Sequence, residues 1–66
     1  MEVKICIEKT RLEKGLSLSE LARRSGVAKS HLHNIERGEK SLTVTVLCKI
    51  AKALDTPAAE LFSYDD

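Results

Sequence analysis

The segment Ser25-Gly26-Val27 is the feature that most constrains the fold of this 66-residue chain. It separates two short runs in which apolar residues recur with helical spacing. Glycine adopts positive φ without a Cβ penalty, so Gly26 suits a sharp turn, with Val27 as an apolar plug beneath it. A connection this short between two helices forces them to cross at a steep angle.

Local signals define the helices on either side of this turn. Ser17 followed by Glu20 is a capping box, which predicts a helix over residues 18–25. The next helix is expected over residues 28–37 and ends at Gly38, because glycine commonly follows the last turn of a helix.

The rest of the sequence predicts three further helices and no strand. The first is expected over residues 2–14 and stops at Gly15. Thr43 is a suitable N-cap for a fourth helix, and Thr56-Pro57 begins a short fifth one. Residues 63–66 are expected to form a frayed acidic tail. The prediction is therefore an all-α, compact five-helix domain that spans residues 1–66.

Length and composition exclude several classes of function. A chain of 66 residues has little room for a deep catalytic cleft, and it offers no nucleophile–base pair or phosphate-binding glycine loop, so we expect no enzyme and no cofactor. No apolar run is long enough to span a membrane, and the charged start MEVKICIEKT is no signal peptide, which predicts a cytoplasmic protein without membrane contact. The net charge of +1 says little about partners, because a near-neutral total can hide a basic face.

Cysteine and histidine give no sign of a metal site. Cys6 and Cys48 are far apart in the sequence and are expected to be reduced core residues rather than a disulfide. His31 and His33 lie two positions apart, and residues at that spacing on a helix point about 200° apart. They cannot share an ion, so we expect no metal.

The run SLSELARRSGVAKSHLHNIERG, residues 17–38, resembles the helix-turn-helix of phage repressor and Cro-type regulators, the Xre family. The later LCKIAKAL and ELF extend the likeness from residue 7 to residue 62, and small restriction–modification controller proteins are similar in size and pattern. The resemblance implies a repressor-like domain whose helix over residues 28–37 is the recognition helix. It also implies a homodimer that binds a palindromic operator.

The outward side of residues 28–37 has the chemistry of a surface that contacts base edges. Leu32 and Ile35 would hold the helix to the core, while a helix in the major groove presents its other side to the bases. Lysine can donate to guanine and asparagine can pair with adenine. With the resemblance, this assigns base contacts to Lys29, Ser30, His33 and Asn34.

Phosphate contacts are expected on both sides of this helix. Helix N-termini and nearby basic or hydroxyl side chains bind phosphate, which assigns this role to Ser17, Ser19, Arg37, Lys40 and Ser41. Arg23 and Arg24 stay open as further contacts or as solvated surface. The resemblance also implies a structural ion pair between Arg11 and Glu36.

We therefore expect a sequence-specific DNA-binding transcriptional regulator, with repression as its direction, in the bacterial or phage nucleoid. Double-stranded DNA and a second copy are the expected partners, with a protein co-regulator as a further one. The dimer interface is assigned to Leu42, Leu61, Phe62 and Tyr64, with a core role as the alternative for Leu61. The alternative function is an antitoxin or phage adaptor of the same fold that mainly binds protein.

Overall fold

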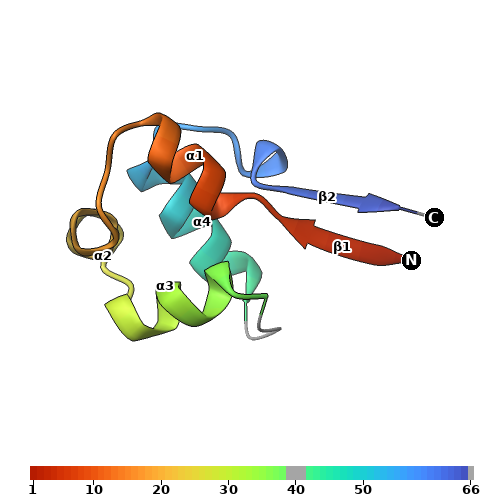
Figure 1. The fold of residues 1–66 in the computed structure, drawn as a ribbon, viewed down its shortest axis with the longest axis horizontal. Coiled ribbons are helices and arrows are strands. Elements are labelled where there is room, and N and C mark those ends of the chain that lie inside the picture. The colour runs from red at the N-terminus through yellow and green to blue at the C-terminus, as the bar shows by residue number, and fades with distance from the viewer. Residues whose placement is uncertain (39–41, 66) are drawn as a thin grey trace.

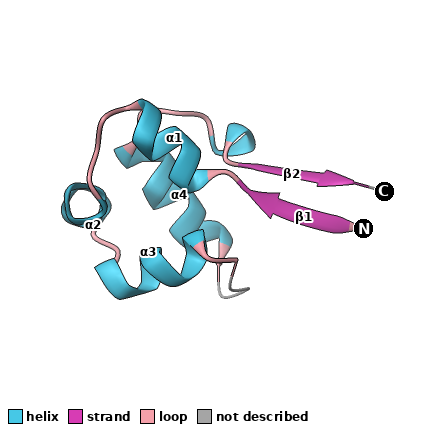
Figure 2. Cartoon of the chain, in the orientation of Figure 1, coloured by secondary structure: helices cyan, strands magenta, loops and turns pink. Residues whose placement is uncertain are grey.

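In the computed structural model, which describes residues 1–38 and 42–65, four α-helices carry a two-stranded ribbon (Figure 1). The elements follow in the order β1 (Glu2–Ile5), α1 (Ile7–Glu13), α2 (Leu18–Ser25), α3 (Lys29–Glu36), α4 (Val44–Ala53), a 3-10 turn (Ala58–Glu60) and β2 (Phe62–Asp65). The helices gather at one end, and the ribbon projects from them with both chain ends at its tip (Figure 2). This projection accounts for the elongated outline of 34 × 20 × 19 Å.

The core lies where the four helices and the 3-10 turn meet. Its largest fully buried side chains are Ile7, Leu21, Leu32, Ile35, Ile50, Leu54 and Leu61. They come from every helix, from Leu54 directly after α4 and from Leu61 directly after the 3-10 turn. Leu32 and Ile35 therefore anchor α3 as the sequence predicts.

Hydroxyl side chains cap two of the helices at the predicted residues. The Glu20 amide donates to Ser17 Oγ at 3.1 Å, and the Val46 amide donates to Thr43 Oγ1 at 3.2 Å. The Glu20 carboxylate contacts Arg23. Of the predicted capping box, the structure therefore shows the hydrogen bond to the Ser17 side chain. These caps fix where α2 and α4 begin.

The predicted helix over residues 2–14 is wrong at its start, because Glu2–Ile5 form strand β1. This strand pairs antiparallel with β2, with Val3 opposite Tyr64 and Ile5 opposite Phe62. The Cys6 amide then donates to the Leu61 carbonyl at 2.8 Å, which closes the ribbon onto the helices. The fold is thus mostly helical with a small sheet, and the all-α prediction is corrected accordingly.

The predicted fifth helix and frayed tail are also wrong. The chain makes only a single 3-10 turn after Pro57, and the following residues form β2. The Thr56 hydroxyl donates backwards to the Leu54 carbonyl at 3.0 Å and caps no helix. Strand pairing with β1 gives residues 63–65 the backbone partners that a frayed end would lack, and residue 66 lies outside the described part of the chain.

One of the two cysteines does not lie in the core, where the sequence predicts both. Cys6 is half-buried beside α1, whereas Cys48 lies exposed on α4. The core assignment of Cys48 is wrong because its position falls outside the buried stripe of α4, which holds Ile50 and Ala51. Both residues are free thiols.

Candidate nucleic-acid interface

A tight turn at Gly26 sets the crossing of α2 and α3. Gly26 has φ +73° and ψ 14°, the left-handed conformation that L side chains rarely adopt. Its amide donates to the Ala22 carbonyl at 3.0 Å, and the Val27 amide donates to Ser25 Oγ at 3.2 Å. Val27 is buried under the turn, as its apolar side chain predicts. The turn is therefore fixed by hydrogen bonds on one side and by packing on the other.

The side of α3 opposite its two anchors faces outward. Lys29, Ser30 and His33 are exposed, and Asn34 is half-buried. Figure 1 shows α3 along one border of the molecule, with α2 above its first turn and the helix otherwise uncovered on its outer side. All four predicted base-contact residues therefore lie on this one helix, and three of them are exposed.

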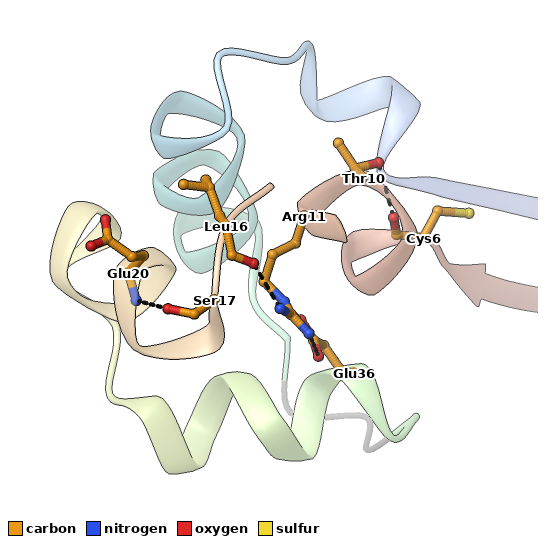
Figure 3. Close-up of polar contacts among 7 residues, drawn as sticks. All are labelled: Cys6, Thr10, Arg11, Leu16, Ser17, Glu20 and Glu36. Atoms are coloured by element: carbon orange, nitrogen blue, oxygen red, sulfur yellow. Dashed lines mark hydrogen bonds and ion pairs between the residues drawn. The ribbon is translucent and has the colours of Figure 1, made fainter. Parts of the chain in front are cut away.

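The ion pair of Arg11 and Glu36 joins α1 to the end of α3. Arg11 Nε lies 2.9 Å from Glu36 Oε2, and Nη2 lies 3.2 Å from Oε1, which is a two-pronged geometry. A third donor, Nη1, reaches the Leu16 carbonyl at 2.9 Å (Figure 3). The two side chains are only 11% and 5% exposed, so the pair is shielded from solvent.

This pair has two electrostatic consequences. The hydrogen bond to Glu36 raises the pKa of Arg11, against the opposing effect of burial, so the guanidinium stays charged. The pair also neutralises Glu36, which is the acidic residue of α3. The remaining charged groups at the outward side of α3 are cationic, with Lys29 at its start and Arg37 just after its end.

The predicted phosphate contacts lie at both ends of this surface. Ser17 and Ser19 are exposed at the N-terminus of α2, and Arg37 is exposed after α3. Lys40 and Ser41 lie outside the described residues. On α2, the Glu20 carboxylate sits 2.8 Å from Arg23 and 3.6 Å from Arg24. Exposed pairs of this kind contribute about 0–1 kcal/mol, which leaves both arginines available to a phosphate.

Removing the cap at Ser17 tests how firmly α2 is positioned. We expect Ser17→Ala to lower the free energy of unfolding by about 1 kcal/mol, because the Glu20 amide loses its acceptor. Urea unfolding followed by circular dichroism measures this loss. Ser19→Ala is the matched control, since Ser19 is exposed within the first turn and its replacement removes the same atoms. An equal effect of both substitutions would contradict the capping role.

The predicted dimer-interface residues fall into two groups. Leu61 is 0% exposed and belongs to the monomer core, so it cannot supply interface area. Leu42 and Phe62 are half-buried and line a groove of about 910 Å³ between β1 and the start of α4. Tyr64 is 60% exposed on the same face of the ribbon as Phe62.

The sequence predictions missed the part that β1 plays in this groove. Residues 1–5 form one of its walls in succession, and Val3 is 55% exposed there. The alternation of charged and apolar residues in Glu-Val-Lys-Ile was the available signal, since a strand presents such residues on opposite faces. Among the described residues, no group of histidine, cysteine, aspartate or glutamate side chains could hold a metal ion.

Comparison with known proteins decides the family. The model of the family described as Helix-turn-helix matches residues 7–61. The chain belongs to this helix-turn-helix family. The match covers α1 to the 3-10 turn, and β1 and β2 lie outside the matched residues.

Two curated helix-turn-helix relatives are named as transcriptional regulators. The chain is 44% identical over 57 residues to SutR of Escherichia coli, covering 86% of this chain and 32% of SutR. It is 43% identical over 61 residues to SinR of Bacillus licheniformis, covering 91% of this chain and 55% of SinR. The chain therefore spans about a third of one relative and about half of the other.

Solved helix-turn-helix structures show the same fold. The restriction–modification controller protein C.AhdI from Aeromonas hydrophila superposes with a TM-score of 0.80 at 36% identity, covering 83% of each chain. The biofilm regulator SinR, solved in complex with DNA, superposes with a TM-score of 0.79 at 45% identity, covering 83% of this chain and 89% of that one. In this chain, none of the described helices is both long and apolar enough to cross a bilayer.

Proposed function

We propose that this chain is a sequence-specific DNA-binding transcriptional regulator that works as a homodimer on a palindromic operator. Lys29, Ser30, His33 and Asn34 would contact base edges in the major groove, and Ser17, Ser19, Arg37, Lys40 and Ser41 would contact phosphates. The protein would act without catalysis in the cytoplasm, at the nucleoid, and repression is the simplest outcome of occupying an operator.

The observation that carries this proposal is the placement of α3. Two fully buried side chains, Leu32 and Ile35, fix one side of the helix, and its donors and acceptors stand on the other. A major groove admits a helix presented in this way. The likeness to SinR, whose structure was solved with DNA, supports the same use of the fold here.

Selection of binders from random duplex DNA tests the proposal, followed by affinity measurements on the selected duplex. We expect Asn34→Ala to weaken binding about 5- to 150-fold, because a two-pronged contact with adenine contributes about 1–3 kcal/mol of discrimination. The selected consensus should relax at one position in each half-site. Lys49→Ala, which alters an exposed residue of α4, is the control and should leave affinity and consensus unchanged.

Salt dependence separates the contacts with phosphate from those with bases. Arg37→Ala should weaken binding to all duplexes to a similar extent and reduce the slope of log affinity against log salt by about one. Fluorescence anisotropy at several ionic strengths measures the slope. An unchanged slope would remove Arg37 from the phosphate contacts, and a relaxed consensus would instead make it a base contact.

Two-fold symmetry predicts the form of the operator. The half-sites should be inverted repeats with centres about 34 Å apart, or one helical turn, so that two α3 helices enter successive major grooves. A selected consensus without inverted symmetry would contradict a homodimer on DNA.

The groove beside β1 favours a second candidate function, that of an antitoxin or adaptor that mainly binds protein. Exposed apolar surface away from α3 is typical of a protein-binding site. This alternative predicts that no duplex is enriched in the selection even at low ionic strength. A single enriched palindrome would argue for the regulator.

A further inference from the structure

Strand β1 has a free edge. Among the residues that the structure describes, the sheet contains two strands, and β1 pairs with β2 alone, on one of its two sides. The backbone N–H and C=O groups that point away from β2 can therefore pair with another strand. A two-stranded ribbon is marginally stable alone in water, and further strands on its edge would stabilise it.

The free edge of β1 borders the apolar groove. Consecutive residues from Met1 to Ile5 line it together with Phe62, the partner of Ile5 on β2, so the groove runs along the whole strand. Across it lie Leu42, Leu47 and Val44, and the Val44 side chain is 78% exposed. A strand that paired with β1 would thus also cover apolar side chains of the α4 region.

The residue order of β1 complements itself. In an antiparallel pair centred on Val3, Glu2 of each copy lies opposite Lys4 of the other, and Val3 lies opposite Val3. Met1 and Ile5 would follow at the two ends of the same register. Every apolar residue then meets an apolar residue on one face, and every charge meets its opposite on the other.

We propose that two copies of this chain associate through antiparallel pairing of their β1 strands about Val3, forming a four-stranded sheet. This pairing specifies which surface forms the homodimer of the proposed function, and it therefore rests on that proposal. A second copy is the occupant that the charge order fits, because a two-fold axis at Val3 makes both Glu2–Lys4 contacts at once.

This interface leaves the DNA-facing side of α3 open. Near the end of α3, Glu36 and Gly38 line the groove. None of the predicted base-contact residues lines it. The ribbon also projects from the helices beside the last turn of α3 rather than across its outer side (Figure 1). Assembly through β1 and contact with DNA can therefore occur together.

Charge reversal with measurement of the dimer dissociation constant by sedimentation equilibrium tests the pairing. Glu2→Lys places two pairs of lysines opposite each other, and Lys4→Glu places two pairs of glutamates. Each should raise the dissociation constant about tenfold. The double variant Glu2→Lys/Lys4→Glu restores opposite charges and should return it to within about twofold of the parent. Glu13→Lys, an exposed charge reversal on α1, is the control and should have no effect.

Effects within one chain can be separated from effects on assembly. Glu2 lies opposite Asp65 of its own chain, so Glu2→Lys replaces a like-charge pair by an attractive one and should not weaken the monomer. Thermal unfolding of the dilute protein checks this. If Glu2→Lys leaves dimerisation unchanged, the β1 pairing is wrong and the homodimer must use another surface. If the parent protein stays monomeric at millimolar concentration, both the pairing and the homodimer are wrong, while the DNA selection still tests α3.

Disulfide trapping gives an independent measurement of the register. Val3→Cys should form a covalent dimer under mild oxidation, because opposite residues in an antiparallel pair have Cα atoms about 4.5–5.5 Å apart, which a disulfide can span. Leu12→Cys is the control, since Leu12 is 61% exposed against 55% for Val3 but lies on α1. Peptide mapping should locate the link between the two substituted positions 3. Equal trapping of both variants, or none of Val3→Cys, would overturn the register.

Discussion

Arg11→Met is expected to unfold most of the protein at 25 °C. The substitution leaves the Glu36 carboxylate, only 5% exposed, without its two-pronged partner and removes the donor to the Leu16 carbonyl. Breaking one side of a buried ion pair costs about 3–5 kcal/mol. A domain of this size has a free energy of unfolding of about the same magnitude. Far-UV circular dichroism and urea unfolding measure the loss.

Two further variants identify the cause of this loss. Arg11→Lys keeps the charge but cannot reproduce the fork, so it should be less damaging than Arg11→Met. Arg11→Met combined with Glu36→Leu removes both charges and should recover much of the stability, because an apolar pair needs no compensation. If the double variant is as unstable as Arg11→Met, the loss comes from packing or from the Leu16 carbonyl without its donor, and not from the unpaired carboxylate.

The pH dependence of the pair follows from the raised pKa of Arg11. A base whose pKa is higher in the folded state contributes stability that is fully present below the pKa it has in the unfolded chain. That contribution declines only as the pH rises through the raised pKa. We therefore expect Arg11 to make its full contribution to the free energy of unfolding at neutral pH. Urea unfolding should show no loss of this contribution between pH 6 and 9.

Leu32→Ala is expected to lower the free energy of unfolding by about 2–5 kcal/mol. Its side chain is 0% exposed among residues from α2, α3 and α4, and its truncation leaves a cavity that the neighbours fill only in part. DNA affinity should fall in proportion to the folded fraction, because the base-contact residues remain present. Measuring urea unfolding and DNA binding on the same sample tests both statements.

His33→Ala is the matched control on the adjacent residue. His33 is exposed, so its removal should change stability by less than about 0.5 kcal/mol. Its loss should weaken DNA binding without unfolding, which is the reverse of the pattern for Leu32→Ala. If both variants lose stability equally, α3 is not divided into a buried and an outward side.

The helical part of the fold could be predicted because its signals are local. Gly26 and the hydroxyl cap at Ser17 each act within a few residues, and the helical period identified Leu32 and Ile35 as anchors. The Arg11–Glu36 pair joins residues 25 positions apart, and only the resemblance to a family pointed to it. The structure contains this pair, whereas the proposed roles of the base and phosphate contacts still depend on the experiments above.

The ribbon was not predicted because its local signal is ambiguous and its strand pairing is non-local. Val3 and Ile7 are four residues apart, a spacing that also fits one side of a helix, and it hid the alternation within residues 2–5. The partner strand lies at the other end of the chain, where Pro57 and the apolar Leu61-Phe62 also fit a short helix. Pairing between Val3 and Tyr64 decided the outcome, and no local window contains both residues.

The pairing of β1 with β2 has a consequence for engineering the molecule. Glu2 and Asp65 are direct partners in the ribbon, so positions 2 and 65 lie side by side. A peptide linker joining them would cyclise the backbone with little distortion of the native state, while it restricts the conformations open to the unfolded chain. Head-to-tail cyclisation should therefore raise the melting temperature, provided that the linker leaves the ribbon intact.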